Sequence, residues 1–113
     1  MVESIVGLYE YIKENYCFQI ELRNEKELFV FFQKDFIMTI TFCNIYKLYF
    51  NNIFYYDVDI QDIIDTINDI FSNTYIFCIV KHKPKNRIKV VSLEKYRDNN
   101  NIINAWTIDK KIK

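Results

Sequence analysis

The sequence predicts an α+β domain: a mostly antiparallel sheet of five to seven strands with two amphipathic helices on one face. Two segments carry apolar residues at helical spacing, and apolar runs typical of strands follow each of them. The predicted order is α-β-β-β-β-β-α-β-β plus a tail. The chain has 113 residues, of which 50% are hydrophobic and 27% are charged, and we expect one domain over residues 1–113.

The first helix is predicted over residues 2–16. Its apolar residues recur every three or four positions, whereas Glu10, Lys13 and Glu14 fall elsewhere around the helix. The apolar positions are Ile5, Leu8, Tyr9, Ile12 and Tyr16. This spacing predicts a helix with one buried face.

Three strands are predicted to follow as a meander. Apolar and polar residues alternate over residues 18–23, and the charged segment 24–27 is typical of a turn. Residues 28–34 and 36–43 are the second and third strands. The second strand has Phe29 and Phe31 on one side and apolar residues on the other, so it lacks the polar face that an open antiparallel sheet normally has.

The fourth and fifth strands are predicted within residues 45–59, which read IYKLYFNNIFYYDVD. Asn51 and Asn52 are expected to form a two-residue type I′ turn, because asparagine tolerates the positive φ that this turn requires. The resulting register pairs Phe50 with Ile53, Tyr49 with Phe54, Leu48 with Tyr55, Lys47 with Tyr56, Tyr46 with Asp57 and Ile45 with Val58.

The second helix is predicted over residues 60–71, with Asp59 as its N-cap and Asp62 in its first turn. Residues 75–83 and 87–96 are then expected to form a second hairpin around the turn at residues 84–86. A polar loop follows at residues 97–101. Periodicity does not decide whether the tail from residue 102 is an edge strand or a short helix.

The predicted helices are too small to cover both faces of the predicted sheet. A helix of this length is about 21 Å long and about 10 Å wide, whereas five to seven strands span roughly 24 to 34 Å. Eleven of the twenty aromatic residues nevertheless lie between Phe29 and Tyr56. Either the sheet curls until it buries them, or this surface meets another chain.

We interpret the aromatic excess as a protein-binding surface, because aromatic side chains give large contact areas. The predicted protein-binding residues are Phe29, Phe31, Tyr46, Tyr49, Phe54, Tyr55 and Tyr56. The alternative is a curled sheet with an aromatic core, to which the composition of an AT-rich genome would contribute.

A basic cluster surrounds the tip of the second hairpin. It consists of Lys81, Lys83, Lys85, Arg87 and Lys89. Such a tip could contact phosphates or an acidic partner. The alternative is a solvated hairpin end whose lysines discourage aggregation, since fifteen basic and fifteen acidic residues leave the chain without net charge.

The sequence predicts no catalytic residue, metal site or cofactor. Asp57, Asp59 and Asp62 could hold Mg²⁺ for a nuclease, but helix capping explains Asp59 and Asp62 more simply. His82 stands among lysines without an evident Cys or Ser nucleophile nearby. A chain with one glycine cannot build a glycine-rich phosphate loop.

The cellular compartment of the protein is inferred from its cysteines and from its N-terminal residues. Cys17, Cys43 and Cys78 are odd in number, widely spaced and set in apolar runs, so we expect them to act as small hydrophobes in strands of a protein in a reducing cytoplasm. No basic segment precedes an apolar run near Met1, and no apolar run is long enough for a membrane span.

The leading hypothesis is a noncatalytic module that binds a larger protein. It would be an accessory or inhibitor protein of a phage, mobile element or low-GC bacterium, such as a host-defence inhibitor or an immunity protein. The same face could also support a homodimer. One alternative is a nucleic-acid-binding protein that uses the basic hairpin at residues 81–89 for phosphates and Tyr or Phe rings for base stacking. The other is a metal-dependent nuclease.

Overall fold

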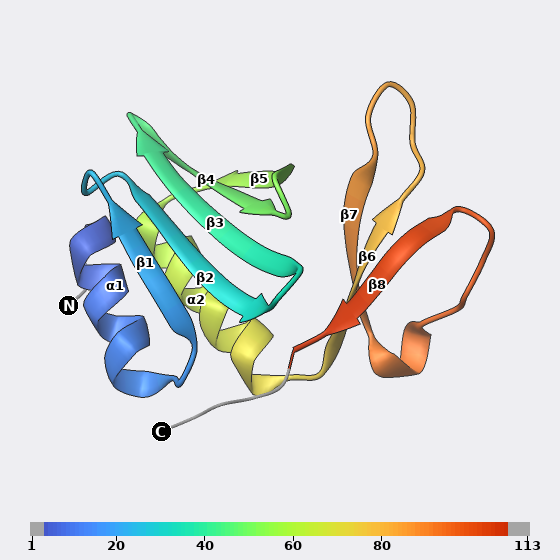
Figure 1. Cartoon of the computed structure of the whole chain (residues 1–113), viewed down its shortest axis with the longest axis horizontal. Coiled ribbons are helices and arrows are strands. Elements are labelled where there is room, and N and C mark those ends of the chain that lie inside the picture. Colours follow the sequence, from blue (N-terminus) through green and yellow to red (C-terminus); the bar gives the residue numbers. More distant parts are fainter. Residues whose placement is uncertain (1–3, 109–113) are drawn as a thin grey trace.

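The computed structural model describes residues 4–108, except for the side chains of residues 56–58. The predicted α+β class and element order are confirmed, and the tail contributes an eighth strand (Figure 1). The elements are α1 (Ile5–Asn15), β1 (Gln19–Arg23), β2 (Glu27–Gln33), β3 (Phe36–Cys43), β4 (Ile45–Phe50), β5 (Ile53–Val58), α2 (Ile60–Ser72), β6 (Tyr75–Val80), β7 (Arg87–Ser92), the 3₁₀ turn η1 (Leu93–Lys95) and β8 (Ile102–Thr107).

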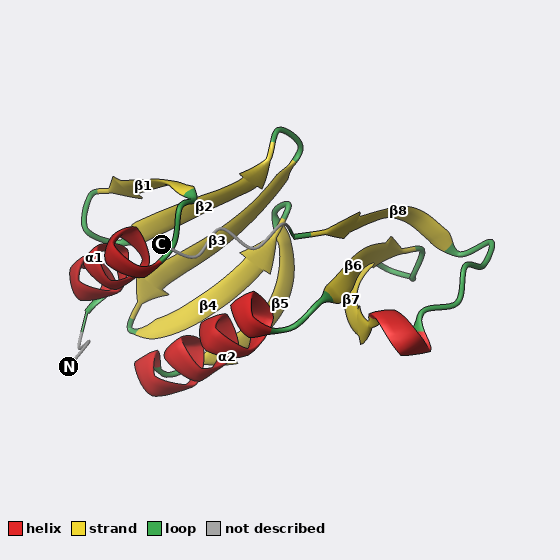
Figure 2. Ribbon diagram, turned by 90° about the horizontal axis from the view of Figure 1, so that it is seen from below, coloured by secondary structure: helices red, strands yellow, loops and turns green. Residues whose placement is uncertain are grey.

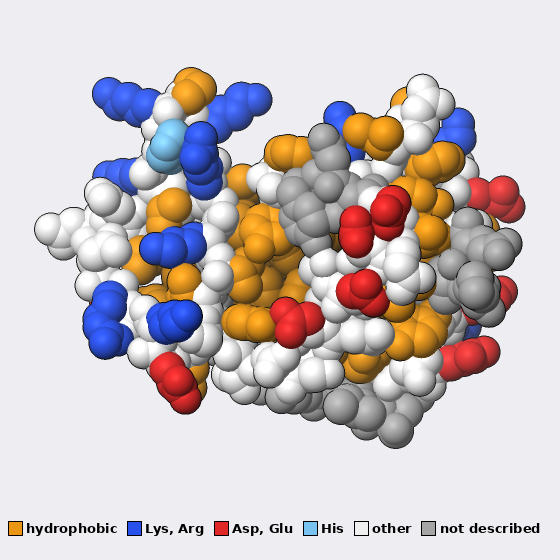
Figure 3. All heavy atoms as spheres, turned by 180° about the vertical axis from the view of Figure 1, so that it is seen from behind, with side chains coloured by type: hydrophobic (Ala, Val, Ile, Leu, Met, Phe, Trp, Pro, Cys, Tyr) orange, Lys and Arg blue, Asp and Glu red, His pale blue; other side chains and the backbone are white. Residues whose placement is uncertain are grey.

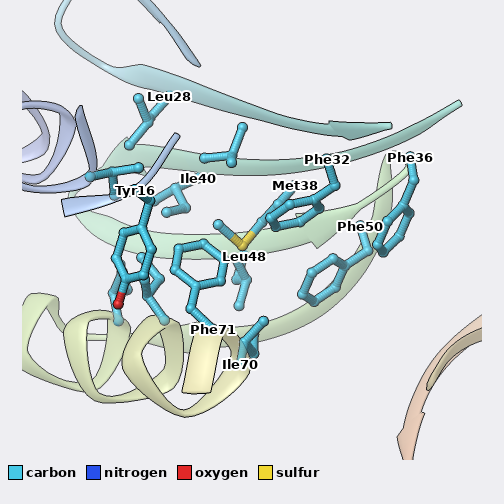
Figure 4. Packing of buried hydrophobic residues seen from close by; sticks show 14 of the residues in the cluster. Tyr16, Leu28, Phe32, Phe36, Met38, Ile40, Leu48, Phe50, Ile70 and Phe71 are labelled. Carbon is cyan, nitrogen blue, oxygen red and sulfur yellow. The ribbon is translucent and has the colours of Figure 1, made fainter. Parts of the chain in front are cut away.

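The first five strands form one antiparallel sheet in the order β1-β2-β3-β4-β5. Both helices lie on the same face of this sheet (Figures 1 and 2). Figure 4 shows Ile70 and Phe71 of α2 pointing into side chains of the sheet, where they meet Met38 and Leu48. The helix-covered side is therefore the core face of the sheet, as the predicted arrangement requires.

Local side-chain hydrogen bonds fix where the helices begin and how they pack together. Ser4 Oγ accepts a bond of 3.1 Å from the amide of Gly7, so α1 begins three residues later than predicted. Asp59 Oδ1 accepts a bond of 2.9 Å from the amide of Asp62, which confirms the predicted N-cap of α2. Tyr11 donates a bond of 2.9 Å to Asn68 and joins the two helices.

The predicted turn between β4 and β5 is confirmed, but the predicted register is only partly right. Asn51 and Asn52 have φ values of 48° and 64°, as a type I′ turn needs. Phe50 pairs with Ile53, and Tyr49 pairs with Phe54. A β-bulge then shifts the pairing by one residue, so the predicted pairs farther from the turn are wrong.

Asn51 also fastens this hairpin to the start of β3. Its side-chain oxygen accepts a bond of 2.8 Å from the amide of Ile37, and its side-chain nitrogen donates one of 2.9 Å to the carbonyl of Asp35. A single asparagine therefore sets both the backbone turn and the position of the hairpin against its neighbour.

The strands after α2 form a separate sheet in the order β7-β6-β8. An aromatic cluster of Phe36, Phe50, Phe77 and Trp106 joins the two sheets. Phe36 stacks on Trp106 with ring centroids 4.8 Å apart and contacts Phe77 at 5.3 Å. Gln33 adds a hydrogen bond of 2.6 Å to the carbonyl of Thr107. The two sheets therefore share one hydrophobic core.

Replacement of Phe36 by Ala should lower the free energy of unfolding by roughly 3 to 5 kcal/mol, because it removes a fully buried ring from this cluster. Phe54→Ala, at a ring that is 49% exposed, should cost about 1 kcal/mol or less. Urea denaturation followed by tryptophan fluorescence measures both changes. Equal losses for the two variants would contradict a core centred on Phe36.

Candidate functional site

The face of the five-stranded sheet that points away from both helices carries a group of aromatic and small side chains. Strand alternation and register place them together on this outer face. We call the following residues the outer face: Phe29, Phe31, Ile37, Thr39, Tyr49 and Phe54. One cross-strand row runs from Phe29 through Thr39 and Tyr49 to Phe54. Because both helices pack on the opposite side, neither covers this row (Figure 2).

Contacts between neighbouring side chains hold the rings of the outer face in place. Phe29 and Phe31 stack with centroids 6.5 Å apart, and the Arg23 guanidinium lies 4.5 Å from the centroid of Phe29. Tyr49 and Phe54 meet edge to face at 5.7 Å. A shallow hollow of about 290 Å³ lies over Phe29, Phe31 and Ile37. The surface is thus a fixed set of rings with a depression beside them.

Charges of both signs border these rings. Arg23, Glu27, Thr41 and Lys47 form the adjoining cross-strand row. Arg23 also makes an ion pair of 3.1 Å with Glu21, and both side chains are about half exposed. The border of the outer face therefore carries no single dominant sign of charge.

The structure divides the predicted protein-binding residues between the two sides of the sheet. Phe29, Phe31, Tyr49 and Phe54 belong to the outer face. Tyr46 and Tyr55 instead pack against the core, and burial raises the pKa of Tyr46. The side chain of Tyr56 lies outside the described residues.

A second candidate surface is the cleft between the β4–β5 hairpin and the tip of the β6–β7 hairpin. We call it the inter-hairpin cleft, and its volume is about 770 Å³. It is lined by Lys47, Tyr49, Asn52, Ile53, Phe54, His82, Pro84, Lys85, Asn86 and Arg87. The cleft brings the aromatic hairpin and the basic hairpin together, although about thirty residues separate them in sequence. Sequence reasoning predicted both hairpins but not their contact.

Charge is strongly divided along the chain despite its zero total. Residues 75–108, which we call the basic lobe, contain seven Lys and Arg but two acidic residues, a net charge of +5. Residues 4–74 contain five basic and eleven acidic residues, a net charge of −6. Figure 3 shows Lys and Arg side chains gathered over the three-stranded sheet.

All five predicted basic contact residues are exposed, but they point to different sides of the lobe. Lys85 and Arg87 line the inter-hairpin cleft. Lys81 and Lys89 line a separate hollow of about 350 Å³, and Lys83 lies with His82 at a third depression. Sequence reasoning did not identify the other residues that line this hollow with Lys81 and Lys89, because they come from the segment after β7, which folds back over the sheet. These lining residues are Lys95, Tyr96 and Arg97.

The remaining polar and cysteine side chains that could take part in chemistry contribute to the fold instead, or lie apart from one another. Asp59 caps α2, and Asp69 accepts a bond of 2.9 Å from the hydroxyl of Tyr75. Cys43 and Cys78 lie in strands as expected, whereas Cys17 lies between α1 and β1. Cys17 and Cys43 are exposed. Cys78 is buried, and burial raises the pKa of its thiol. Among the described side chains, no three His, Cys, Asp or Glu residues are grouped to hold a metal ion.

No family model, curated protein or solved structure matches this chain. Within residues 4–108, neither helix is long and apolar enough to cross a membrane.

Asp59→Ala should lower the free energy of unfolding by about 1 kcal/mol, because the amide of Asp62 loses its acceptor. Asp59→Asn should stay close to the wild-type value, since Asn also caps helices well. Urea denaturation measures both, and titration calorimetry with Mg²⁺ provides the comparison. Loss of Mg²⁺ binding without loss of stability would favour the nuclease hypothesis instead.

Proposed function

We propose that this protein is a noncatalytic binding module that docks the outer face of its five-stranded sheet on a larger protein. Such a module would act as an accessory or inhibitor protein. The observation that carries the proposal is the aromatic row on the side of the sheet opposite both helices. An antiparallel sheet whose second face meets only water normally carries polar residues there.

The chemistry of the outer face suits a protein partner better than a nucleic acid. Protein interfaces commonly have an aromatic centre and a polar rim, and the charged row of Arg23, Glu27 and Lys47 provides such a rim. Glu21 and Glu27 stand beside the rings, and their carboxylates would repel phosphates. A protein can complement charges of both signs, whereas a polyanion cannot.

The area of the outer face is smaller than a standard protein interface, so the partner must also contact neighbouring surfaces. Five strands span about 24 Å, and a strand of six residues is about 20 Å long, so the sheet offers roughly 500 Å². A standard interface covers about 800 Å² on each partner. The contact must therefore extend past the sheet. The inter-hairpin cleft adjoins the outer face at Tyr49, so this is one direction in which the partner can continue.

Phe29→Thr combined with Phe31→Thr should weaken binding of the partner by at least tenfold, because the two stacked rings leave the centre of the contact. Thr keeps the strand propensity, so the fold should persist. The partner would be isolated from host lysate and purified, and its Kd for each variant measured by calorimetry.

Leu93→Thr is the matched control, because Leu93 is a large hydrophobic side chain that is 58% exposed on the basic lobe. It should leave the Kd within twofold. Sedimentation velocity of the pure protein tests the homodimer: self-association that the double variant abolishes would make a second copy the partner. An unchanged Kd for the double variant would refute docking through the outer face.

A further inference from the structure

The inter-hairpin cleft has the charge of an anion-binding site. Lys47, Lys85 and Arg87 line it together with His82, and none of its described lining residues is acidic. Lys85 and Arg87 are exposed members of a lobe with a net charge of +5. Clefts lined by one sign of charge concentrate ligands of the opposite sign, so the ligand expected here is anionic.

The same cleft offers an aromatic ring for stacking. Phe54 is 49% exposed, and its edge-to-face contact with Tyr49 limits the orientations of the ring before any ligand arrives. An exposed ring held in place can stack on any planar base at a small cost in conformational entropy. Asn52 and Asn86 also line the cleft, and their amides can donate and accept hydrogen bonds.

Two further hollows on the lobe are basic, and each shares a lining residue with the next. His82 lines both the cleft and the depression that contains Lys81 and Lys83. Lys81 in turn borders the hollow lined by Lys89, Lys95, Tyr96 and Arg97. An extended polyanion that entered the cleft would therefore meet further cations along the hairpin, together with a second aromatic residue in the hollow.

We propose that the inter-hairpin cleft binds single-stranded nucleic acid, with a base stacked on Phe54 and adjacent phosphates held by Lys85 and Arg87. A duplex hides the faces of its bases, so only unpaired bases can use the ring. An acidic peptide would satisfy the cations but leave the aromatic wall without a planar partner. This site shares Tyr49 and Phe54 with the outer face but differs from it in charge, because Glu21 and Glu27 stand beside the rings at the other end of that face. It adds a second ligand class to the proposed protein binding.

The probe is a fluorescein-labelled oligothymidylate of about twelve nucleotides, within the range of site sizes known for small single-strand-binding domains. Fluorescence anisotropy gives its Kd at several salt concentrations. For the wild-type chain we expect binding that weakens steeply as salt rises. Lys85→Glu with Arg87→Glu should weaken binding by at least tenfold and reduce the salt dependence. Phe54→Ala should weaken it about fivefold or more with the salt dependence unchanged.

Lys26→Glu with Lys34→Glu is the matched control, because it makes the same charge change at two exposed lysines in the turns of the five-stranded sheet. It should weaken binding less than threefold. Phe29→Thr with Phe31→Thr should leave the Kd for the oligonucleotide unchanged, so that failure of this inference and failure of the proposed protein docking are told apart. Circular dichroism confirms that each variant is folded.

Several results would overturn the inference. One is that the oligothymidylate does not bind at low salt. Another is that Lys26→Glu with Lys34→Glu weakens binding as much as Lys85→Glu with Arg87→Glu does. A third is that Phe54→Ala leaves the Kd unchanged. Equal affinity for a duplex of the same length would show that the ring is not used. Competition by polyglutamate that is equally sensitive to Phe54→Ala would assign the cleft to an acidic protein instead.

Discussion

The stacking of Phe36 on Trp106 is the contact on which the inter-hairpin cleft depends, because it holds the two sheets together. Phe36 opens β3, and Trp106 belongs to the last described strand, so a contact of 4.8 Å closes a loop of about seventy residues. Phe50 and Phe77 complete the cluster from the two sheets. The cluster sets the distance between the β4–β5 and β6–β7 hairpins, and the inter-hairpin cleft exists because that distance is fixed.

The packing of the two sheets determines where the separated charges lie. The two parts of the chain carry −6 and +5 over the described residues, and a composition count of zero conceals the difference. The aromatic cluster holds the positive part against one end of the five-stranded sheet. The cations of the β6–β7 hairpin therefore lie beside Tyr49 and Phe54 rather than at an isolated tip, which changes what these rings can recognise.

Local features of the fold were predictable because neighbouring residues determine them. Asn51 and Asn52 predict their own turn, Asp59 predicts its cap, and the apolar spacing of both helices predicts their buried faces. The bulge between Leu48 and Tyr49, where Tyr55 is the extra residue in β5, was not predictable, because an extra residue in one strand has no clear signature in alternation. It alters the pairing of Tyr55, which packs against the core rather than joining the outer face.

The separation of the strands into two sheets and the contact between the two hairpins could not be predicted from the sequence, because both depend on how the sheets pack together. The strands within residues 75–107 form their own sheet instead of extending the first one, and contacts such as Phe36 with Trp106 join the two sheets. The basic hairpin and the aromatic hairpin were each identified, and the nucleic-acid hypothesis used lysines and aromatic rings together, but nothing in the sequence placed the two hairpins side by side. Their meeting in one cleft shows why composition and periodicity could not rank the two functions.

The limited area of helix explains why a small chain can present two surfaces. Two helices cover one face of the five-stranded sheet, which leaves the outer face available. Three more strands then build a second sheet at the end of the first rather than a layer over it (Figure 1). The outer face and the inter-hairpin cleft share Tyr49 and Phe54. A protein on the first surface and a nucleic-acid strand in the second would therefore lie side by side, and each would change the surroundings of the other.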